Sequence, residues 1–373
     1  MKIDARRLIG LLYKNLDGPL LLLAACLMAA NLAVLYSASN QSMDKIMSQL
    51  INMSVAAGIM WIAANISPQR MMMLGPPLYL IGFVLLIGVA LTGDVVNGAR
   101  RWLHIGVTRI QPSEIMKIAL PMMLAWYFQR QEAVLKLRDF AIATLIMLLP
   151  LGLILKQPDL GTAILVSAAS FYILFLAGLP WYIVGTLVLA GIGGIYFVTN
   201  WDLCIKIFHD YQCRRVATML DPMQDPLGAG YHTIQGTIAI GSGGVLGKGW
   251  LNGTQTHLDF IPERTTDFIF AVFAEEFGLL GNCLLLVLYL LVIARGLFIS
   301  SRASSFFGRL LAGSITLSFF TYAFVNMGMV SGILPVVGVP LPLISYGGTA
   351  LVTLSLGFGI LMSIHAHRKL VQT

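Results

Sequence analysis

The sequence predicts an all-α integral membrane protein with about ten transmembrane helices, and three observations lead to this fold class. Hydrophobic residues make up 57% of the 373 residues and charged residues only 11%, against about a quarter charged in ordinary soluble domains. Apolar runs of about 18 residues or more, each able to cross a bilayer core of about 30 Å, recur along the chain. These runs are continuous rather than alternating, which favours helices over a transmembrane barrel. We therefore interpret residues 1–373 as one polytopic membrane domain and exclude a soluble enzyme.

The first apolar run, residues 18–37, follows a basic start and must be compared with a secretory signal peptide. The apolar core of a signal peptide is about 7 to 15 residues long, and this run is longer. Ser37-Ala38-Ser39 has a slight likeness to a cleavage site. We nevertheless expect an uncleaved first span.

The later apolar runs predict nine further spans. They lie at 47–66, 74–92, 113–128, 139–156, 160–177, 181–199, 268–294, 307–329 and 342–364. Between the seventh and eighth spans stands one long polar loop, residues 200–267. Ten spans place both termini on the same side of the membrane.

The distribution of basic residues selects that side. The side of the termini carries thirteen Lys and Arg against four Asp and Glu, whereas the opposite side carries eleven against thirteen. Because cytoplasmic loops are enriched in Lys and Arg, both termini are predicted to be cytoplasmic and the 200–267 loop external.

The external basic residues gather in two places, around the outer end of the fourth span and in the long loop. They are Arg100, Arg101, Arg109, Lys117, Lys206, Arg214, Arg215, Lys248 and Arg264. Basic residues kept on this side indicate an anionic ligand such as a phosphate group. Pairing with the acids of the same loop is the plainer alternative.

Four external helix starts share capping residues. They are Gln111-Pro112-Ser113-Glu114, Gln157-Pro158-Asp159-Leu160, Thr265-Thr266-Asp267, and Ser345-Tyr346-Gly347-Gly348 in the first turn of the tenth span. Capping alone explains each of them. If the four starts converge, however, their free amides also favour an anion.

Three further patterns carry competing interpretations. Glu114 and Lys117 lie three residues apart on one helical face, as an ion pair would, and charge at membrane depth indicates function. Asp159 is interpreted mainly as a structural cap, with substrate contact as the alternative. The glycine-rich run 241–249 lacks the spacing of a nucleotide-binding loop. It predicts a tight re-entrant or surface loop whose amides could bind anions.

The four cysteines fit no metal-binding or redox spacing. Cys204 and Cys213 share the external loop, so a disulfide is conceivable. A helix between them would instead keep their Cα atoms beyond the limit of about 7 Å.

The chain resembles the SEDS (shape, elongation, division and sporulation) family over nearly its whole length, and most closely its rod-shape, RodA-like branch. The resemblance rests on Gly98-Ala99-Arg100-Arg101-Trp102-Leu103, Gln111-Pro112-Ser113-Glu114, Gln157-Pro158-Asp159-Leu160-Gly161-Thr162, Asp225-Pro226-Leu227-Gly228-Ala229-Gly230-Tyr231-His232, Gly247-Lys248-Gly249-Trp250, Pro262-Glu263-Arg264, Thr266-Asp267-Phe268-Ile269-Phe270, Ala274-Glu275-Glu276 and Gly338-Val339-Pro340-Leu341-Pro342. The family usually has His where this chain has Thr265.

The resemblance implies a bacterial inner-membrane peptidoglycan glycosyltransferase that polymerises lipid II during cell elongation. It also implies a class B penicillin-binding protein as transpeptidase partner, and other membrane proteins of the elongation machinery. The essential aspartate of the family matches Asp267. No nucleic acid partner is expected.

Asp267 is accordingly the predicted general base for the acceptor hydroxyl. Arg101, Lys117, Lys248 and Arg264 are predicted to hold pyrophosphate, with Glu114 orienting Lys117. Asp159, Glu263 and Ser345 are further candidate lipid II contacts. The position of Asp267 at a helix N-terminus and its closeness to Arg264 would both make it a weaker base, unless burial offsets these two effects. Alternatively, Asp267 holds a divalent cation, Mg or Mn, on the pyrophosphate.

Two other functions remain open. A flippase for lipid II would also use ten helices with buried charges, but transporters place polar residues and interrupted helices at mid-membrane depth. Here the polar residues gather at the external ends of the spans. A non-catalytic scaffold of the elongation machinery explains the apolar spans but not the external basic residues.

Overall fold

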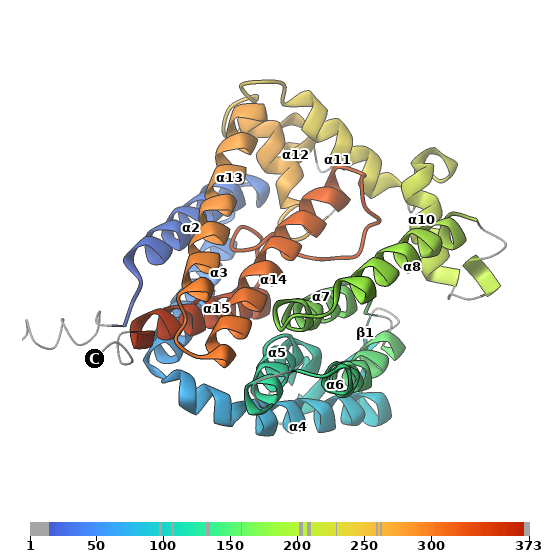
Figure 1. Ribbon diagram of the computed structural model, residues 1–373. Coiled ribbons are helices and arrows are strands. Elements are labelled where there is room, and N and C mark those ends of the chain that lie inside the picture. The colour runs from blue at the N-terminus through green and yellow to red at the C-terminus, as the bar shows by residue number, and fades with distance from the viewer. Residues whose placement is uncertain are drawn as a thin grey trace, which may run out of the picture.

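The computed structural model describes residues 15–368, apart from 97–98, 106–107, 132–134, 158, 201–203, 207–209, 229, 259 and 262. Long helices dominate this part of the chain (Figure 1). They are α2 (Gly18–Ala38), α3 (Met43–Asn65), α4 (Pro68–Thr92), α5 (Pro112–Arg130), α6 (Leu137–Lys156), α7 (Leu160–Leu176), α8 (Trp181–Thr199), α13 (Ile269–Ser301), α14 (Phe306–Val330) and α15 (Gly348–Ala366). Each of the ten expected spans overlaps one of these helices.

Eight of the described helices are long and apolar enough to cross a membrane. The other two candidates are α7, which is apolar but has 17 residues, and α5, which carries Glu114, Lys117 and Arg130. The membrane-protein class is thus supported, while the number of ten spans and the orientation remain predictions.

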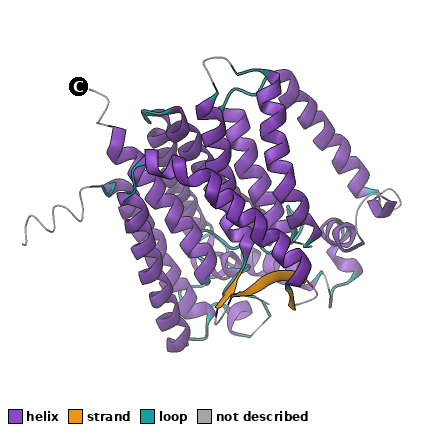
Figure 2. Ribbon diagram, turned by 90° about the horizontal axis from the view of Figure 1, so that it is seen from below, coloured by secondary structure: helices purple, strands orange, loops and turns teal. Residues whose placement is uncertain are grey.

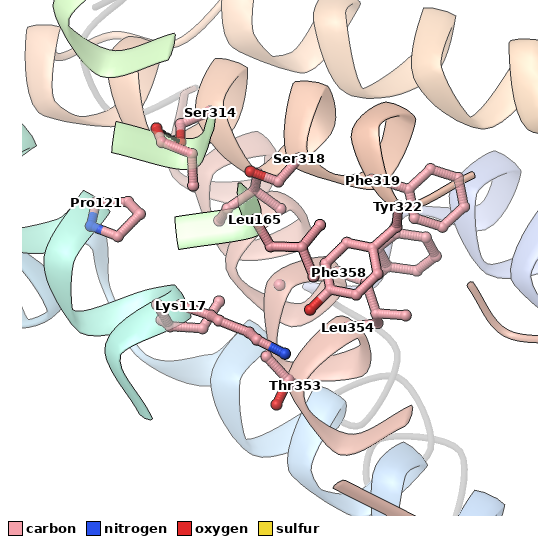
Figure 3. A pocket seen from close by; sticks show the side chains of 14 residues that line it. Lys117, Pro121, Leu165, Ser314, Ser318, Phe319, Tyr322, Thr353, Leu354 and Phe358 are labelled. Carbon is pink, nitrogen blue, oxygen red and sulfur yellow. Dashed lines mark hydrogen bonds between the residues drawn. The ribbon is translucent and has the colours of Figure 1, made fainter. Parts of the chain in front are cut away.

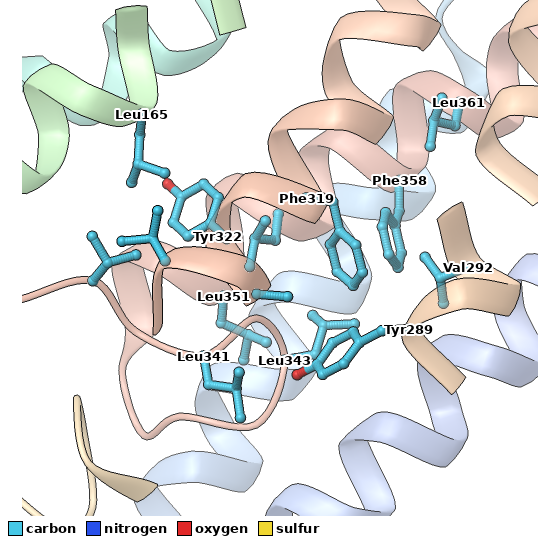
Figure 4. Close-up of a cluster of buried hydrophobic side chains, with 14 of the residues drawn as sticks. Leu165, Tyr289, Val292, Phe319, Tyr322, Leu341, Leu343, Leu351, Phe358 and Leu361 are labelled. Atoms are coloured by element: carbon cyan, nitrogen blue, oxygen red, sulfur yellow. The ribbon is translucent and has the colours of Figure 1, made fainter. Parts of the chain in front are cut away.

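Helix α14 is the centre of the bundle. It packs against α13, α7, α5, α15 and α11 (Tyr231–Ser242), and 72% of its membrane-length window is buried. Figure 4 shows the aromatic core that it forms with its neighbours. The ring of Phe319 lies 5.5 Å from that of Tyr289 on α13 and 5.4 Å from that of Phe358 on α15. A helix held on all sides in this way is a rigid support for loops at its ends.

The two ends of the described chain meet at one end of the bundle. Asp17 caps α2 through the amide of Leu20, and its carboxylate accepts hydrogen bonds from Arg295 at 3.0 and 2.5 Å. His365, near the end of α15, lies 3.3 Å from the same carboxylate. This pairing of the first and last spans agrees with an even number of crossings.

The expectation of an all-α fold was wrong in one segment. A three-stranded antiparallel sheet connects α4 to α5. Its strands are β1 (Asp94–Val96), β2 (Ala99–Ile105) and β3 (Thr108–Ile110), with Val96 opposite Ala99 and Ile105 opposite Thr108. Figure 2 shows the strands at one end of the helical bundle. The sequence does contain Asn97-Gly98, a dipeptide that favours tight hairpin turns.

The tenth helix begins six residues later than predicted, at Gly348 rather than residue 342. Leu343 and Gly347 have positive φ values of 61° and 155°, which a helix does not allow. The side-chain amide of Asn31 donates to the carbonyls of Leu343 and Ser345, at 3.0 and 3.3 Å. Ser345 therefore lies in a loop before α15 and not in the first turn of the helix.

Helix α13 is broken at Gly278, where φ is 62° and ψ is −161°. The glycine-rich loop after α11 (Tyr231–Ser242) fills the break. The amides of Leu279 and Leu280 donate to the carbonyls of Gly244 and Val245, at 2.9 and 3.0 Å. On the other side of the break, the carbonyls of Glu275 and Glu276 accept from the amides of Lys248 and Gly249, at 3.1 and 3.0 Å.

These four backbone hydrogen bonds, here called the clasp, correct the interpretation of the glycine-rich run 241–249. Buried backbone groups need partners, and these amides and carbonyls satisfy one another. The amides of residues 248 and 249 are thus committed to α13, whereas the sequence left them available to anions. The loop is tight, as predicted, and whether it is re-entrant or lies at the surface stays a prediction.

The 200–267 segment contains α10 (Asp210–Leu220), the short η1 (Pro222–Gln224), α11 and α12 (Thr254–His257). Cys204 and Cys213 are joined in a disulfide with their Cα atoms 5.9 Å apart, so the argument against pairing was wrong. Neighbouring α8 packs against α10 at the edge of the bundle (Figure 1), and none of its residues is buried.

Mass mapping of peptides under non-reducing conditions should find Cys204 and Cys213 linked, with Cys26 and Cys283 free. The linkage should disappear after reduction. Two free thiols in the 204–213 peptide of the unreduced protein would contradict the structure here.

Candidate active site

Asp267 lies at the end of the long loop, directly before α13. The N-cap residue of that helix is Phe268, and the helix has no side-chain capping bond. The interpretation of Asp267 as a helix cap was therefore wrong. Asp267 lines a pocket of about 200 Å³ together with Thr266, Pro340, Leu341, Ser345 and residues of the first turns of α15. A Cβ atom built on Gly338 would lie 3.4 Å from Oδ2 of Asp267. This is an ordinary contact distance, so the backbone at Gly338 lies directly beside the carboxylate.

Burial, and secondarily the negative charge of Glu263, raise the pKa of Asp267 to about 6. The sequence left open whether the helix N-terminus and Arg264 would make Asp267 too weak a base. The two effects that dominate act in the opposite direction. A carboxylate with this pKa is mostly ionised at neutral pH and is still basic enough to accept a proton.

Arg264 and Glu263 hold the loop beside Asp267. The guanidinium of Arg264 donates to the carbonyl of Thr256 in α12. Glu263 has a φ of 49°, and its Oε2 accepts a hydrogen bond of 2.9 Å from Thr266. Both candidate residues therefore support the local shape of the loop, and their contact with substrate stays a prediction.

Lys248 is engaged in an ion pair that the sequence did not predict. Its Nζ lies 2.7 Å from Oε1 of Glu275 and 2.7 Å from Oγ1 of Thr254. The carboxylate of Glu275 is fully buried and also accepts from the amides of Gln255 and Thr256, at 2.9 and 3.2 Å. Lys248 therefore anchors the loop to α13, which makes it a weaker candidate for pyrophosphate.

Glu114 and Lys117 form the predicted ion pair, with Nζ of Lys117 2.6 Å from Oε1 of Glu114. The ammonium group also lies over the ring of Tyr322, 5.4 Å from its centre, and Thr353 donates to Oε2 of Glu114 at 3.3 Å. Figure 3 shows Lys117 pointing toward Tyr322 and Thr353 across a small apolar pocket. The charge of Lys117 is thus held at the interface of α5, α14 and α15.

An apolar groove of about 340 Å³ begins beside this pair. Glu114 and Gln111 give it a polar end, and aliphatic side chains of α4, α5 and α15 line the rest. Thr349 lines both this groove and the Asp267 pocket. The groove and the carboxylate are therefore on neighbouring sides of the start of α15.

Asp159 acts as the predicted cap, with Oδ1 accepting from the amide of Thr162 at 3.1 Å. Its Oδ2 accepts from the side-chain amide of Gln111 at 3.0 Å, which joins the starts of α5 and α7. Arg101 is close by, since its Nε donates to the carbonyl of Gln157 at 3.4 Å. Asp159 is thus a structural link, and its contact with substrate is untested.

The four helix starts are linked to one another, although only the start of α7 has a side-chain cap. Gln111 and Asp159 connect two of them, and a Cβ on Gly161 would lie 2.6 Å from the carbonyl of Val337, in the loop before α15. The amide of Tyr346 in that loop donates to the carbonyl of Thr265 at 2.9 Å. These links could not be predicted, because each motif is local in the sequence.

The hydroxyl of Ser345 is used by the protein backbone. It donates to the carbonyl of Thr266 at 2.6 Å and accepts from the amide of Leu341 at 2.7 Å, and the residue is buried. Among the described residues, no three His, Cys, Asp or Glu side chains form a metal-binding group.

The comparisons with known proteins agree with this architecture. Residues 18–370 match the model of the FtsW/RodA/SpoVE family of cell cycle proteins. The chain is 49% identical to the peptidoglycan glycosyltransferase MrdB of Escherichia coli K12 over 357 residues, which cover 96% of this chain and 95% of that protein. It is 34% identical over 354 residues to the peptidoglycan glycosyltransferase RodA of Treponema pallidum, covering 77% of this chain and 82% of that protein.

Two solved structures have the same fold. One is a chain from a study of how a peptidoglycan synthase complex coordinates polymerization and crosslinking, with a TM-score of 0.80, 32% identity, and coverage of 96% of this chain and 99% of that one. The other is the rod shape determining protein RodA of Thermus thermophilus, with a TM-score of 0.71, 28% identity, and coverage of 94% and 97%. This chain is a member of the FtsW/RodA/SpoVE family.

Proposed function

We propose that this chain, a peptidoglycan glycosyltransferase, polymerises lipid II at the external face of the bacterial inner membrane during cell elongation, with Asp267 as the general base. The observation that carries the proposal is a half-buried carboxylate in a pocket at the end of the long loop, with its pKa raised to about 6. The 49% identity to a named peptidoglycan glycosyltransferase supports the reaction class.

The reaction is a displacement at the anomeric carbon of the donor sugar. Asp267 takes the proton from the 4-hydroxyl of the acceptor's terminal GlcNAc, and the hydroxyl oxygen forms a bond to that carbon. The bond from the carbon to the pyrophosphate oxygen breaks, and its electron pair leaves with undecaprenyl pyrophosphate. Asp267 then returns its proton to water. A base in a buried site is suited to this step because it can be ionised and still accept a proton near neutral pH.

The apolar groove beside Glu114 is suited to the polyprenyl chain of a lipid substrate. Its polar end and Lys117 lie next to the Asp267 pocket through shared residues of α15. Among the four predicted cations, Lys117 is therefore the strongest candidate to contact pyrophosphate. Arg101 is second, whereas Lys248 and Arg264 mainly hold the loop.

A divalent cation fits the same carboxylate. The charge of Glu263 acts on Asp267, and paired carboxylates together with substrate phosphates are the ligands that Mg²⁺ prefers. When bound, such a cation would neutralise charge on the departing pyrophosphate. Asp267 would then orient the phosphate group instead of accepting the proton.

A class B penicillin-binding protein is the proposed partner. The solved chain that matches at a TM-score of 0.80 belongs to a peptidoglycan synthase complex in which polymerization and crosslinking are coordinated. A polymerase of this fold needs a second protein for crosslinking. We propose that this partner and other elongation proteins assemble with the membrane domain of this chain.

Reconstitution with labelled lipid II tests the function. The purified chain is placed in liposomes with and without the transpeptidase, and both glycan length and movement of lipid II across the bilayer are measured. We expect glycan chains, with more of them in the presence of the partner. Movement of lipid II without polymer would instead establish a flippase. The absence of both activities would favour a scaffold.

Glycan synthesis should depend on pH through Asp267. Because the ionised carboxylate is the active form and its pKa is raised to about 6, the rate should fall about tenfold per pH unit below pH 6 and level off above it. The rate at saturating lipid II, measured between pH 5 and pH 8, tests this. An acidic limb near pH 4, the ordinary range of an aspartate, would contradict the assigned environment.

A further inference from the structure

Three consecutive carbonyl groups around Asp267 are each bound by a group from another part of the chain. The amide of Tyr346 donates to Thr265 at 2.9 Å, and the hydroxyl of Ser345 donates to Thr266 at 2.6 Å. The side-chain amide of Asn326 donates to the carbonyl of Asp267 itself at 2.8 Å. The backbone that carries the carboxylate is thus held at three successive points.

Asn326 makes the most deeply placed of these bonds. It belongs to α14, the central helix, and is completely buried. Its Nδ2 also donates to the carbonyl of Val339 at 2.7 Å. Asn326 therefore uses both hydrogens of one amide group to join the Asp267 backbone to the loop that forms the opposite wall of the pocket.

The second bond fixes the space in which the carboxylate lies. Val339 follows Gly338, which lies beside Oδ2 of Asp267, and precedes Pro340, which lines the pocket. A shift of either backbone segment would change the distance from the carboxylate to a bound acceptor. Displacement by about 1 Å can lower a rate about 100-fold.

We propose that Asn326 is a positioning residue of this enzyme. Its side-chain amide holds the main-chain carbonyls of Asp267 and Val339 and thereby fixes the position of the Asp267 carboxylate. The proposal rests on the proposed function, since it assigns Asn326 a role in the reaction of Asp267. Asn326 is not among the residues that line the pocket, so it acts through the two backbone segments that it holds, those of Asp267 and Val339. Its loss should therefore slow the chemical step and leave substrate binding nearly unchanged.

The test is the steady-state rate of glycan synthesis by Asn326→Leu, reconstituted with the transpeptidase. Leu has the same number of side-chain heavy atoms and the same branching at Cγ but no donor, so the two carbonyls lose their partner. We expect kcat about 100-fold lower with the KM for lipid II within twofold of wild type. Should Asn326→Leu lower the melting temperature more than the control does, Asn326→Ala, which adds no bulk, takes its place in the same measurement.

Ser300→Ala is the matched control. Ser300 is buried and donates to the carbonyl of Arg309 at 2.7 Å, at the other end of the α13–α14 pair. Its loss removes a comparable bond far from Asp267, and kcat should stay within twofold of wild type. A kcat for the Asn326 variant within threefold of wild type, or a raised KM at unchanged kcat, overturns the proposal.

Asp267→Asn in the same assay separates the two claims. If Asp267→Asn is inactive and the Asn326 variant is fully active, the requirement for the Asp267 carboxylate stands and the positioning role fails. If Asp267→Asn polymerises lipid II normally, the proposed function of Asp267 fails, and the role of Asn326 fails with it.

Discussion

Glycan synthesis by Asp267→Asn should fall about 100- to 10,000-fold, because this is the typical contribution of a general base. Asn has nearly the same size and cannot accept the proton. The bonds that hold this residue use its main-chain carbonyl, so the substitution leaves them in place. Expression, thermal stability and lipid II binding should therefore remain close to wild type. Labelled lipid II and gel separation of glycan chains provide the measurement.

Asp44→Asn is the control for loss of charge. Asp44 is exposed in the first turn of α3, where the same change removes a carboxylate without touching the pocket. Its glycan synthesis should equal that of wild type. Undiminished synthesis by Asp267→Asn would exclude both roles considered for this residue, the base and the cation ligand, since each needs the carboxylate.

Features set by neighbours in sequence could be predicted. The apolar runs place the ten long helices because a span needs about 20 consecutive apolar residues. The spacing of Glu114 and Lys117 predicts their ion pair, and the structure shows it at 2.6 Å. Asp159 caps α7 as its position before the helix indicates. Each of these inferences requires only a helix and its immediate flanks.

Features that join distant segments could not be predicted in this way. Glu275 and Lys248 are 27 residues apart, and Asn326 is 59 residues from Asp267. A buried Asn in an apolar helix is a visible signal, since polar groups at membrane depth indicate function, but its partner is not. The sheet between α4 and α5 was missed for another reason, because the long apolar runs on either side dominate the pattern.

The pKa of Asp267 shows the same limit. A helix start and Arg264 are visible in the sequence, and both favour a weaker base. Burial depends on how the loops before α13 and α15 fold over each other, and it has the larger effect. The electrostatic character of the candidate base is thus a property of tertiary packing.

Gly278→Ala should destabilise the protein by several kcal/mol. The backbone at Gly278, with φ of 62° and ψ of −161°, lies in a region that only glycine adopts readily, at a cost of about 1–3 kcal/mol for other residues. A Cβ there would lie 2.2 Å from the amide nitrogen of Gly247 and 2.8 Å from the carbonyl oxygen of Val245. Both contacts are with backbone atoms, so no side chain can rotate away, and overpacking adds about 1–3 kcal/mol.

The substitution should also affect the candidate active site, because the hydrogen bonds between the glycine-rich loop and α13 lie on both sides of the break at Gly278. The loop that fills the break at Gly278 continues into Lys248, which pairs with Glu275 beneath α12. Thermal unfolding of the purified chain should show a clearly lower midpoint for Gly278→Ala, together with a loss of glycan synthesis. Gly191→Ala is the control, since a Cβ at Gly191 in α8 meets no atom within 4 Å and alanine favours a helix. A midpoint for Gly278→Ala equal to that of Gly191→Ala would mean that the break in α13 is not required for the fold.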